Sequence, residues 1–262
     1  MGLATLLGRE RGFFIPHRYA AAVQPCAYPA LERHLAACVP AFEAVLADIE
    51  AQGQRLEQMR GPAPRFDQGW FPTLDAAAAY AIVRRARPAR IVEVGSGHST
   101  RFLARAIADA ELETALVCID PAPRAPLRGL PVRWIETVVQ RAPENLFADL
   151  RAGDALFVDS SHILMPGTDV DWLLNRILPG LSEGVLVHFH DVFLPDPYPE
   201  AWAWRGYNEQ QALAPLLHGA AYDCLFASHY ARTRLPDRLV PALARLPPPA
   251  APESSLWLQR RE

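Results

Sequence analysis

Acidic and histidine side chains follow several apolar segments of the sequence, where parallel strands would end. The segments "RIVEV", "ALVCID", "DALFVD" and "GVLVHFHD" bring Glu93, Asp120, Asp159, His190 and Asp191 to such ends, and His162 follows Asp159 by three residues. Carboxylates and imidazoles can bind polar ligands, hold a divalent metal or move a proton. Because the carboxyl ends of parallel strands meet at one edge of a sheet, the sequence predicts one shared polar site.

The glycines of "VEVGSGHST" lie between an apolar run and a helical pattern. Gly95 and Gly97 let the backbone bend sharply and approach a ligand, and a helix opened by Ser99 or Thr100 presents free N–H groups. The third glycine of a dinucleotide-binding turn is missing, which argues against a bound pyrophosphate. Asp120, 25 positions after Gly95, can accept hydrogen bonds from ribose hydroxyls. The competing interpretation is a packing turn without a ligand.

The second group of polar residues allows two chemistries. Asp159, His190 and Asp191, together with His162, could hold a divalent ion that lowers the pKa of a substrate hydroxyl. Alternatively, His162 or His190 could act as a metal-free general base. The structural alternatives are that Asp159 caps the following turn and that His188, on the same strand face as His190, belongs to the core.

Composition narrows the classes of partner and mechanism. The chain has 262 residues, of which 50% are hydrophobic, and a formal net charge of -3 without a long basic run. A nucleic-acid partner therefore has no support, and a small-molecule partner is expected. The sequence contains no lysine, so all 26 basic residues are arginine, which excludes Schiff-base chemistry, a lysine base and a P-loop lysine.

Cysteines and the N-terminal segment indicate a cytoplasmic protein without a membrane anchor. The four cysteines lack a C-x-x-C pairing and are expected to be free, mostly buried thiols. The run "MGLATLLGRERGFF" is too short for a signal peptide and has Leu6 where myristoylation needs Ser or Thr. No segment approaches the roughly 20 apolar residues that span a bilayer.

The elements that position these residues alternate between helix and strand from Thr73 onward. Helices are predicted over 73–86, 100–110, 145–152, 169–178 and 209–217, and strands over 90–94, 115–120, 132–137, 154–159 and 184–190. This alternation predicts an α/β fold with a parallel sheet covered on both faces. Later apolar runs at 223–230 and 254–259 are expected to pair antiparallel at the sheet edge, on either side of a proline-rich excursion at 235–252.

The first part of the chain shows helical spacing that Pro40 should interrupt. We predict an N-terminal helical cap over residues 1–66 and a single larger domain over residues 67–262. The amphipathic helices could cover the active site or form a homodimer surface. Two aromatic segments have open roles: "FDQGWFP" could cover the cofactor or complete the core, and "LPDPYPEAWAWRGYNEQ" could form a lid or a packed connector.

The motifs "VEVGSGHSTRFLARA", "CIDP", "LFVDSSH" and "VLVHFHD" resemble those of class I S-adenosylmethionine-dependent methyltransferases, over about residues 66–230. The sequence is most similar to a bacterial group with "VDSSH", "GTDV" and "VHFHDVFLP". The resemblance implies a Rossmann-like seven-stranded sheet, mostly parallel, with "SSLWLQ" inserted antiparallel. It also implies that adenine binds near residues 137–140 and that Asp120 holds the ribose. The cofactor-binding residues implied are Glu93, Gly95, Ser96, Gly97, Ser99, Thr100, Asp120 and Asp159.

The expected reaction is methyl transfer from S-adenosylmethionine to an oxygen, or a nitrogen, of a small polar acceptor. Asp159, His162, His190 and Asp191 are the candidate catalytic residues. Catechol-type methyltransferases, which this arrangement resembles, bind magnesium at the same strand ends, so Asp159, His190 and Asp191 are also candidate metal ligands. The alternatives are a metal-dependent hydrolase or hydroxylase on the same scaffold and a non-catalytic cofactor-binding subunit.

Overall fold

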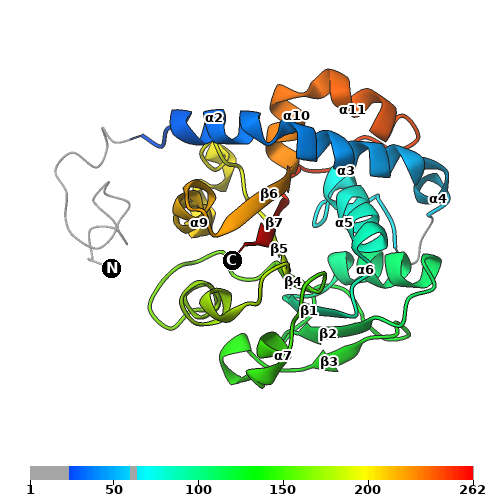
Figure 1. Cartoon of the computed structure of the whole chain (residues 1–262), viewed down its shortest axis with the longest axis vertical. Helices are drawn as coiled ribbons and strands as arrows, with labels where there is room; N and C mark the ends of the chain where they lie inside the picture. The colour runs from blue at the N-terminus through cyan, green and yellow to red at the C-terminus, as the bar shows by residue number, and fades with distance from the viewer. Residues whose placement is uncertain (1–23, 60–63, 262) are drawn as a thin grey trace.

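A seven-stranded sheet forms the centre of the computed structural model, which describes residues 24–59 and 64–261 (Figure 1). The strand order is β3-β2-β1-β4-β5-β7-β6. Only β7 runs antiparallel to its neighbours. The strands are β1 (Arg90–Val94), β2 (Ala115–Ile119), β3 (Arg133–Ile135), β4 (Ala155–Val158), β5 (Leu186–Phe189), β6 (Tyr222–Ala227) and β7 (Leu256–Arg260). The predicted fold class and the antiparallel insertion of the last strand are confirmed.

Helices cover both faces of this sheet, with α5 and α6 on one side and α9 on the other (Figure 1). The helices are α2 (Pro29–Ala37), α3 (Val39–Ala51), α4 (Gly53–Glu57), α5 (Thr73–Ala86), α6 (His98–Asp109), α7 (Asn145–Ala148), α8 (Asp169–Trp172), α9 (Glu209–His218), α10 (Ser228–Arg234) and α11 (Pro236–Leu243). A π-helical turn (Leu173–Ile177) continues α8, and short 3₁₀ turns occur at Val139–Arg141, Leu178–Gly180 and Glu200–Arg205.

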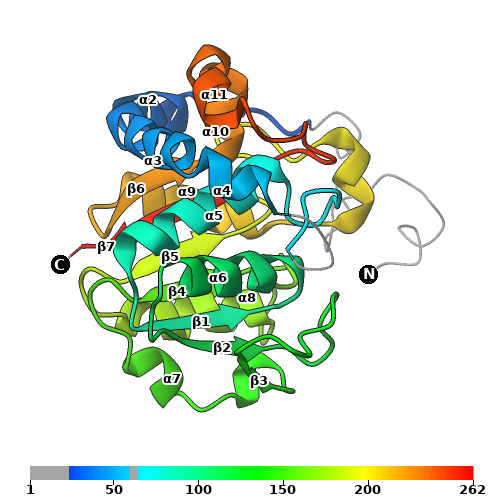
Figure 2. The same ribbon diagram turned by 90° about the vertical axis from the view of Figure 1, so that its right-hand side faces the viewer.

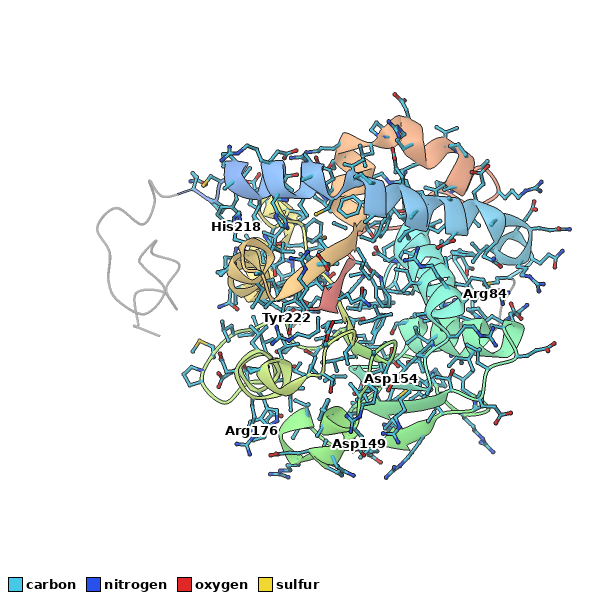
Figure 3. The ribbon with its side chains drawn as sticks, viewed as in Figure 1. Arg84, Asp149, Asp154, Arg176, His218 and Tyr222 are labelled. Atoms are coloured by element: carbon cyan, nitrogen blue, oxygen red, sulfur yellow. The ribbon has the colours of Figure 1, made fainter. Side chains whose placement is uncertain are left out.

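The central strands are apolar on both faces because helices bury both. Every residue of β4 and β5 is buried, as are Ile91 to Val94 of β1. At the amino end of β4, Asp154 accepts hydrogen bonds from the backbone N–H groups of Arg90 (2.8 Å) and Arg151 (3.0 Å). Figure 3 labels this residue. The ends that carry the predicted site lie at the opposite edge of the sheet.

The N-terminal helices pack on the main body rather than apart from it. Helix α3 contacts α5, α11 and β6, and α2 contacts α9. Pro40 lies in the first turn of α3, where its missing N–H costs no helical hydrogen bond. Leu31, Phe42 and Ile49 join the same buried cluster as the strands. The division at residue 66 stays a prediction, and Figure 2 shows α2 and α3 beside β6.

Two differences from the predicted elements concern the last part of the chain. The run at 223–230 divides into β6 and the start of α10, and the excursion at 235–252 contains α11. Pro236 begins α11, and Pro241 lies inside it. Prolines suggested an irregular segment there, but burial of Leu239 and Ala242 favours the helix. In the described ranges no helix is long and apolar enough to cross a membrane.

Candidate active site

Two adjoining cavities lie at the carboxyl ends of the parallel strands. The larger has a volume of about 570 Å³, and the smaller one about 40 Å³. Ser96, Arg124 and Asp159 line both. The larger cavity lies between the loops that follow β1, β2, β3 and β4, and the smaller lies toward the loop after β5. No residue of α2 to α4 lines either cavity.

The glycine turn after β1 forms the wall between these cavities. Gly95 has a left-handed φ of 79°, and a Cβ atom placed there would lie 1.8 Å from the backbone oxygen of Asp159. A side chain would therefore push the end of β4 away from β1. Gly95 and Ser96 line the larger cavity, and Gly97 lines the smaller one. The turn thus places the predicted glycines beside a possible ligand.

Glu93, in contrast, lies behind the turn and lines neither cavity. It is fully buried and accepts hydrogen bonds from the hydroxyls of Ser99 and Thr100, both at 2.6 Å, and from the thiol of Cys118 at 3.2 Å. Burial raises the pKa of Glu93 to about 7 despite these hydrogen bonds. Glu93 and Thr100 therefore support the first turn of α6, whereas the glycine turn, His98 and Ser99 reach a cavity.

Asp120 lines the larger cavity, but its carboxylate also holds the loops together. One oxygen accepts hydrogen bonds from the backbone N–H (2.6 Å) and the hydroxyl (3.1 Å) of Ser96, and the other accepts from the N–H of Ala122 (2.7 Å). The oxygen that accepts from Ala122 has a further lone pair for a ligand hydroxyl, whereas both lone pairs of the other are used by Ser96. Asp120 can therefore still accept a hydrogen bond from a ribose hydroxyl, and this contact stays a prediction.

The far wall of the larger cavity comes from residues 137–140 and from the segment after β4. Gln140 donates its amide N–H to the carbonyl of Gly167 at 2.9 Å, while its Oε1 is buried without a hydrogen-bond partner in the described part of the chain. The hydroxyl of Ser160, on the same cavity, is also buried and unpartnered there. Both residues line the larger cavity, although the two unpartnered atoms themselves are buried. Buried polar atoms without a partner in the described residues are candidate hydrogen-bonding groups for a polar ligand.

A histidine–carboxylate cluster, comprising Asp75, Asp159, His162, His190, Asp191 and Glu209, closes the smaller cavity. Glu209 Oε2 lies 2.9 Å from His162 Nδ1, and Asp75 Oδ2 lies 3.2 Å from His190 Nε2. The other nitrogen of each ring lies 3.4–3.5 Å from carboxylate oxygens of Asp159 and Asp191. Each imidazole is therefore fixed by one outer carboxylate, Glu209 or Asp75, and its other nitrogen points toward the inner carboxylates of Asp159 and Asp191.

The carboxylates set the charge of both imidazoles. Burial alone would lower the pKa of His162, but hydrogen bonds to Asp159 and Glu209 outweigh it and hold that pKa well above 6.5. Burial also opposes the charge of His190, yet the negative charges of Asp159 and Asp191 raise its pKa well above 6.5. For Asp159 burial works in the other direction, and the charge of His190 keeps its pKa well below the ordinary range.

Backbone strain marks the same residues. His162 has a φ of 60° and Asp191 a φ of 56°, both in the left-handed region that non-glycine residues rarely adopt. Such strained positions gather at sites where a side chain must point in one direction. Backbone N–H groups of Asn208 and Glu209 donate to the carbonyl of His162 at 3.1 and 3.3 Å and hold this loop in place.

The structure separates the predicted catalytic residues into two groups. Asp159, His162 and Asp191 line the smaller cavity, whereas His190 lines neither cavity and lies behind them. His188 is fully buried, stacks on Phe157 at 3.7 Å and contacts the hydroxyl of Ser255 at 2.9 Å. His188 therefore lies in the core, as its structural alternative predicted.

The predicted metal site is not supported. No group of three or more His, Cys, Asp or Glu side chains within residues 24–59 and 64–261 is arranged to hold a metal ion. Asp159, His190 and Asp191, the predicted magnesium ligands, are paired with one another and with His162 instead. The carboxylates favour protonated imidazoles, and a protonated ring nitrogen has no lone pair for a metal.

Aromatic residues form the rim of the smaller cavity. Trp70 is half-exposed there, whereas Phe71 turns inward and is 1% exposed, although it also reaches the cavity wall. In the segment after β5, Trp204 is 81% exposed, so this residue is not packed into the core. Arg205 lies 3.9 Å from the ring of Trp202 and lines the cavity together with Tyr207. This segment therefore forms a wall of the cavity.

Sequence reasoning missed Asp75 and Glu209, the two outer carboxylates of the cluster. Asp75 lies in the first turn of α5, 115 residues from His190 in the chain, and Glu209 begins α9, 47 residues from His162. An acid in the otherwise apolar helix "TLDAAAAYAIV" was the available signal for Asp75. No comparable pattern distinguishes Glu209 from an ordinary acid in the first turn of a helix.

One family model matches part of this chain. Residues 92–192 match the family model described as a methyltransferase domain. No curated protein sequence matches the chain. Among solved structures, the chain is 18% identical to the S-adenosylhomocysteine-bound methyltransferase PaMTH1 of Podospora anserina, with 96% of this chain and 100% of that chain covered and a TM-score of 0.44.

A second similar structure is the branched-chain polyamine synthase of Thermus thermophilus, at 16% identity, 81% and 64% coverage and a TM-score of 0.45. These likenesses add nothing to the argument beyond the family match. The match spans the glycine turn, Asp120, Asp159, His190 and Asp191. Residues 92–192 therefore form a methyltransferase domain, and this match and the observed strand order agree with the predicted resemblance to class I S-adenosylmethionine-dependent methyltransferases.

Proposed function

We propose that this enzyme transfers the methyl group of S-adenosylmethionine to an oxygen of a small polar acceptor, with a nitrogen as the less favoured alternative. The observation that carries the proposal is that the two cavities adjoin at Asp159, which lines both. The larger accommodates the adenosyl group, and the smaller contains a fixed imidazole where a methyl group would be received. A cofactor site and a proton-accepting site thus share one wall.

The larger cavity offers one partner for each polar part of the nucleoside. Asp120 is proposed to accept hydrogen bonds from the ribose hydroxyls. Gln140 Oε1, buried and unpartnered in the described structure, is suited to accept a hydrogen bond from the adenine amino group. The Ser160 hydroxyl can donate to a ring nitrogen or to the ribose. This arrangement leaves the sulfonium end beside the smaller cavity.

His162 is the proposed general base for an oxygen acceptor. His162 lines the smaller cavity, and Glu209 holds its Nδ1. Nε2, which lies beside Asp159 and Asp191 of the same cavity, is the nitrogen left to take a proton. As the acceptor oxygen forms its bond to the methyl carbon, the bond from that carbon to sulfur breaks and its electron pair stays on sulfur. The acceptor proton passes to Nε2, and the products are a methyl ether and S-adenosylhomocysteine.

His190 and Asp75 act in this proposal as positioning residues. His190 touches neither cavity, but its ring lies between Asp75 and the inner carboxylates. It keeps Asp159 ionised, and its contacts with Asp159 and Asp191 hold both side chains in place. Most of the rate enhancement is expected from holding the acceptor oxygen in line with the methyl carbon and sulfur.

The test combines binding and transfer measurements. Titration calorimetry with S-adenosylhomocysteine should show binding to the wild type and to His162→Gln, whereas methyl transfer from labelled cofactor to a panel of phenols, alcohols and amines should fall at least roughly 100-fold in His162→Gln. His229→Gln is the matched control, because His229 pairs with Asp196 at 2.8 Å and lines neither cavity.

The outcomes separate the alternatives. Absence of S-adenosylhomocysteine binding by the wild type would sink the proposal, and binding without transfer to any acceptor would favour a non-catalytic subunit. Elemental analysis of the purified protein and transfer assays with a chelator test the metal-free route. If transfer strictly required an added divalent ion, that ion and not His162 would be the group that activates the acceptor. Firmly bound iron would instead favour an oxidation reaction on the same scaffold.

A further inference from the structure

Two arginines line the smaller cavity, Arg124 after β2 and Arg205 after β5, and of the two Arg124 also lines the larger one. We propose that Arg124 binds the carboxylate of the methionine end of S-adenosylmethionine. This assignment rests on the proposed function. It names a cofactor-binding residue outside the glycine turn and outside the strand-end acids.

The backbone of Arg124 is fixed against the glycine turn. Its N–H donates to the carbonyl of Ser96 at 3.2 Å, and a Cβ atom placed on Gly97 would lie 3.4 Å from the Arg124 Cβ. The guanidinium carbon lies 4.4 Å from the ring centroid of Trp70, which also lines the smaller cavity. Cation–π stacking of this kind limits the directions that the side chain can take.

The Arg124 guanidinium has its hydrogen-bond donors available. It forms no ion pair or side-chain hydrogen bond with any other residue that the structure describes. Arg205 is placed differently, because its Nη1 lies 3.9 Å from Asp191 Oδ2 and donates to the Tyr207 hydroxyl at 3.3 Å. A free planar guanidinium suits two parallel hydrogen bonds to a carboxylate.

The charges around the junction match an amino-acid zwitterion. Of the charged residues on the larger cavity, Asp120, Asp159 and Asp169 are acidic, and Arg124 is basic. The ammonium and carboxylate of methionine share one carbon, so their partners must lie close together. Asp159 and Arg124 both line both cavities and therefore offer an anion and a cation at the same junction. Asp159 faces the ammonium group in this arrangement, and Arg124 faces the carboxylate.

The assignment is tested by comparing two ligands on one variant. S-adenosylhomocysteine carries the amino-acid carboxylate, and 5′-methylthioadenosine lacks the whole amino-acid end. Calorimetric titration of Arg124→Gln should show a Kd for S-adenosylhomocysteine that is raised roughly 10- to 100-fold, the effect of losing a charge-assisted contact. The Kd for 5′-methylthioadenosine should stay within about twofold of wild type. Arg124→Lys, which keeps the charge without the fork, should lie between.

Arg128→Gln and Arg205→Gln are the comparison variants. Arg128 is an exposed residue of the same loop that lines neither cavity, so its loss should leave both Kd values unchanged. An unchanged Kd for S-adenosylhomocysteine in Arg124→Gln overturns the assignment, and so does equal weakening of both ligands. If only Arg205→Gln selectively weakens binding of S-adenosylhomocysteine, the carboxylate is bound by Arg205 and the assignment to Arg124 is wrong. If the wild type binds neither ligand, the proposed function itself fails.

Discussion

His162 can accept a proton only after losing the one that its carboxylate neighbours stabilise. Because the pKa of His162 is raised well above 6.5, the neutral base form grows as pH rises, and kcat/KM should increase toward an alkaline plateau. Glu209→Gln removes the negative partner 2.9 Å from Nδ1. We expect the apparent pKa of the rate profile to fall by about one unit or more and the plateau to drop roughly 10-fold.

The measurement is kcat/KM for any accepted substrate between pH 6 and 10. Glu200→Gln is the matched control, since Glu200 is exposed and begins the neighbouring 3₁₀ turn, and its profile should follow wild type. A Glu209→Gln profile that keeps its pKa while losing rate at every pH would mean that Glu209 supports the loop without tuning the base.

Glu93 gives stability a different dependence on pH. Its pKa is about 7 in the folded protein against an ordinary value of 4.5, so the folded state holds an extra proton between these values. The free energy of unfolding should therefore fall as pH rises through this window, by up to about 3 kcal/mol. Glu93→Gln cannot ionise, so in urea unfolding at pH 5 to 8 the wild type should lose stability relative to this variant.

Glu183→Gln, an exposed change of the same kind, should show no such trend. Parallel pH curves for wild type and Glu93→Gln would refute the role assigned to the buried carboxyl. Glu93 also shows what sequence cannot decide at the scale of one residue. An acid at the end of a buried strand has the same pattern whether it faces a ligand or, as here, the hydroxyls of the next helix.

At the scale of elements, the turn between β1 and α6 controls strand packing, because Gly95 sets the distance between β1 and the end of β4. Gly95→Ala would place a Cβ atom 1.8 Å from the Asp159 carbonyl oxygen at a φ of 79°. Gly129→Ala is the matched control, with a φ of 88° and no atom within 4 Å. Both carry backbone strain, so their difference isolates the clash.

We expect Gly95→Ala to cost about 1–3 kcal/mol more stability than Gly129→Ala, as overpacking does. Its affinity for S-adenosylhomocysteine should also fall, since the clash displaces Asp159 from the cavity junction. Urea unfolding and calorimetry measure both effects. Equal stability and equal affinity of the two alanine variants would show that the close approach of the strands is not required.

Sequence predicted elements best where burial and local pattern agree. β1 and α5 begin and end where their apolar periodicity does, because both are enclosed by other elements. α11 was missed because proline argues locally against a helix, whereas packing of Leu239 supplied the deciding energy. The outer carboxylates of the cluster were missed for a related reason. Asp75 meets His190 through a contact between residues 115 positions apart in the chain, which no local pattern encodes.

At the scale of the whole molecule, the N-terminal helices are part of the common core. Phe42 of α3 is fully buried, with its ring 5.8 Å from that of Phe226 on β6 and 5.9 Å from that of Tyr230 on α10. An independent cap would bury such a residue within its own helices. Contacts that connect the first helices to the last strands indicate one cooperative folding unit, although the chain segments are far apart in sequence.

Phe42→Ala tests this cooperativity. Deleting the ring should cost about 3–5 kcal/mol and move the whole unfolding transition to lower urea, because the cavity opens in a core that all elements share. Far-ultraviolet circular dichroism and tryptophan fluorescence should report the same midpoint, and affinity for S-adenosylhomocysteine should be unchanged, since α3 lines neither cavity. Val240→Ala, at an exposed position of α11, should change stability by less than about 0.5 kcal/mol. Two separate transitions, of which only the first moves in Phe42→Ala, would instead identify the N-terminal helices as an independent unit.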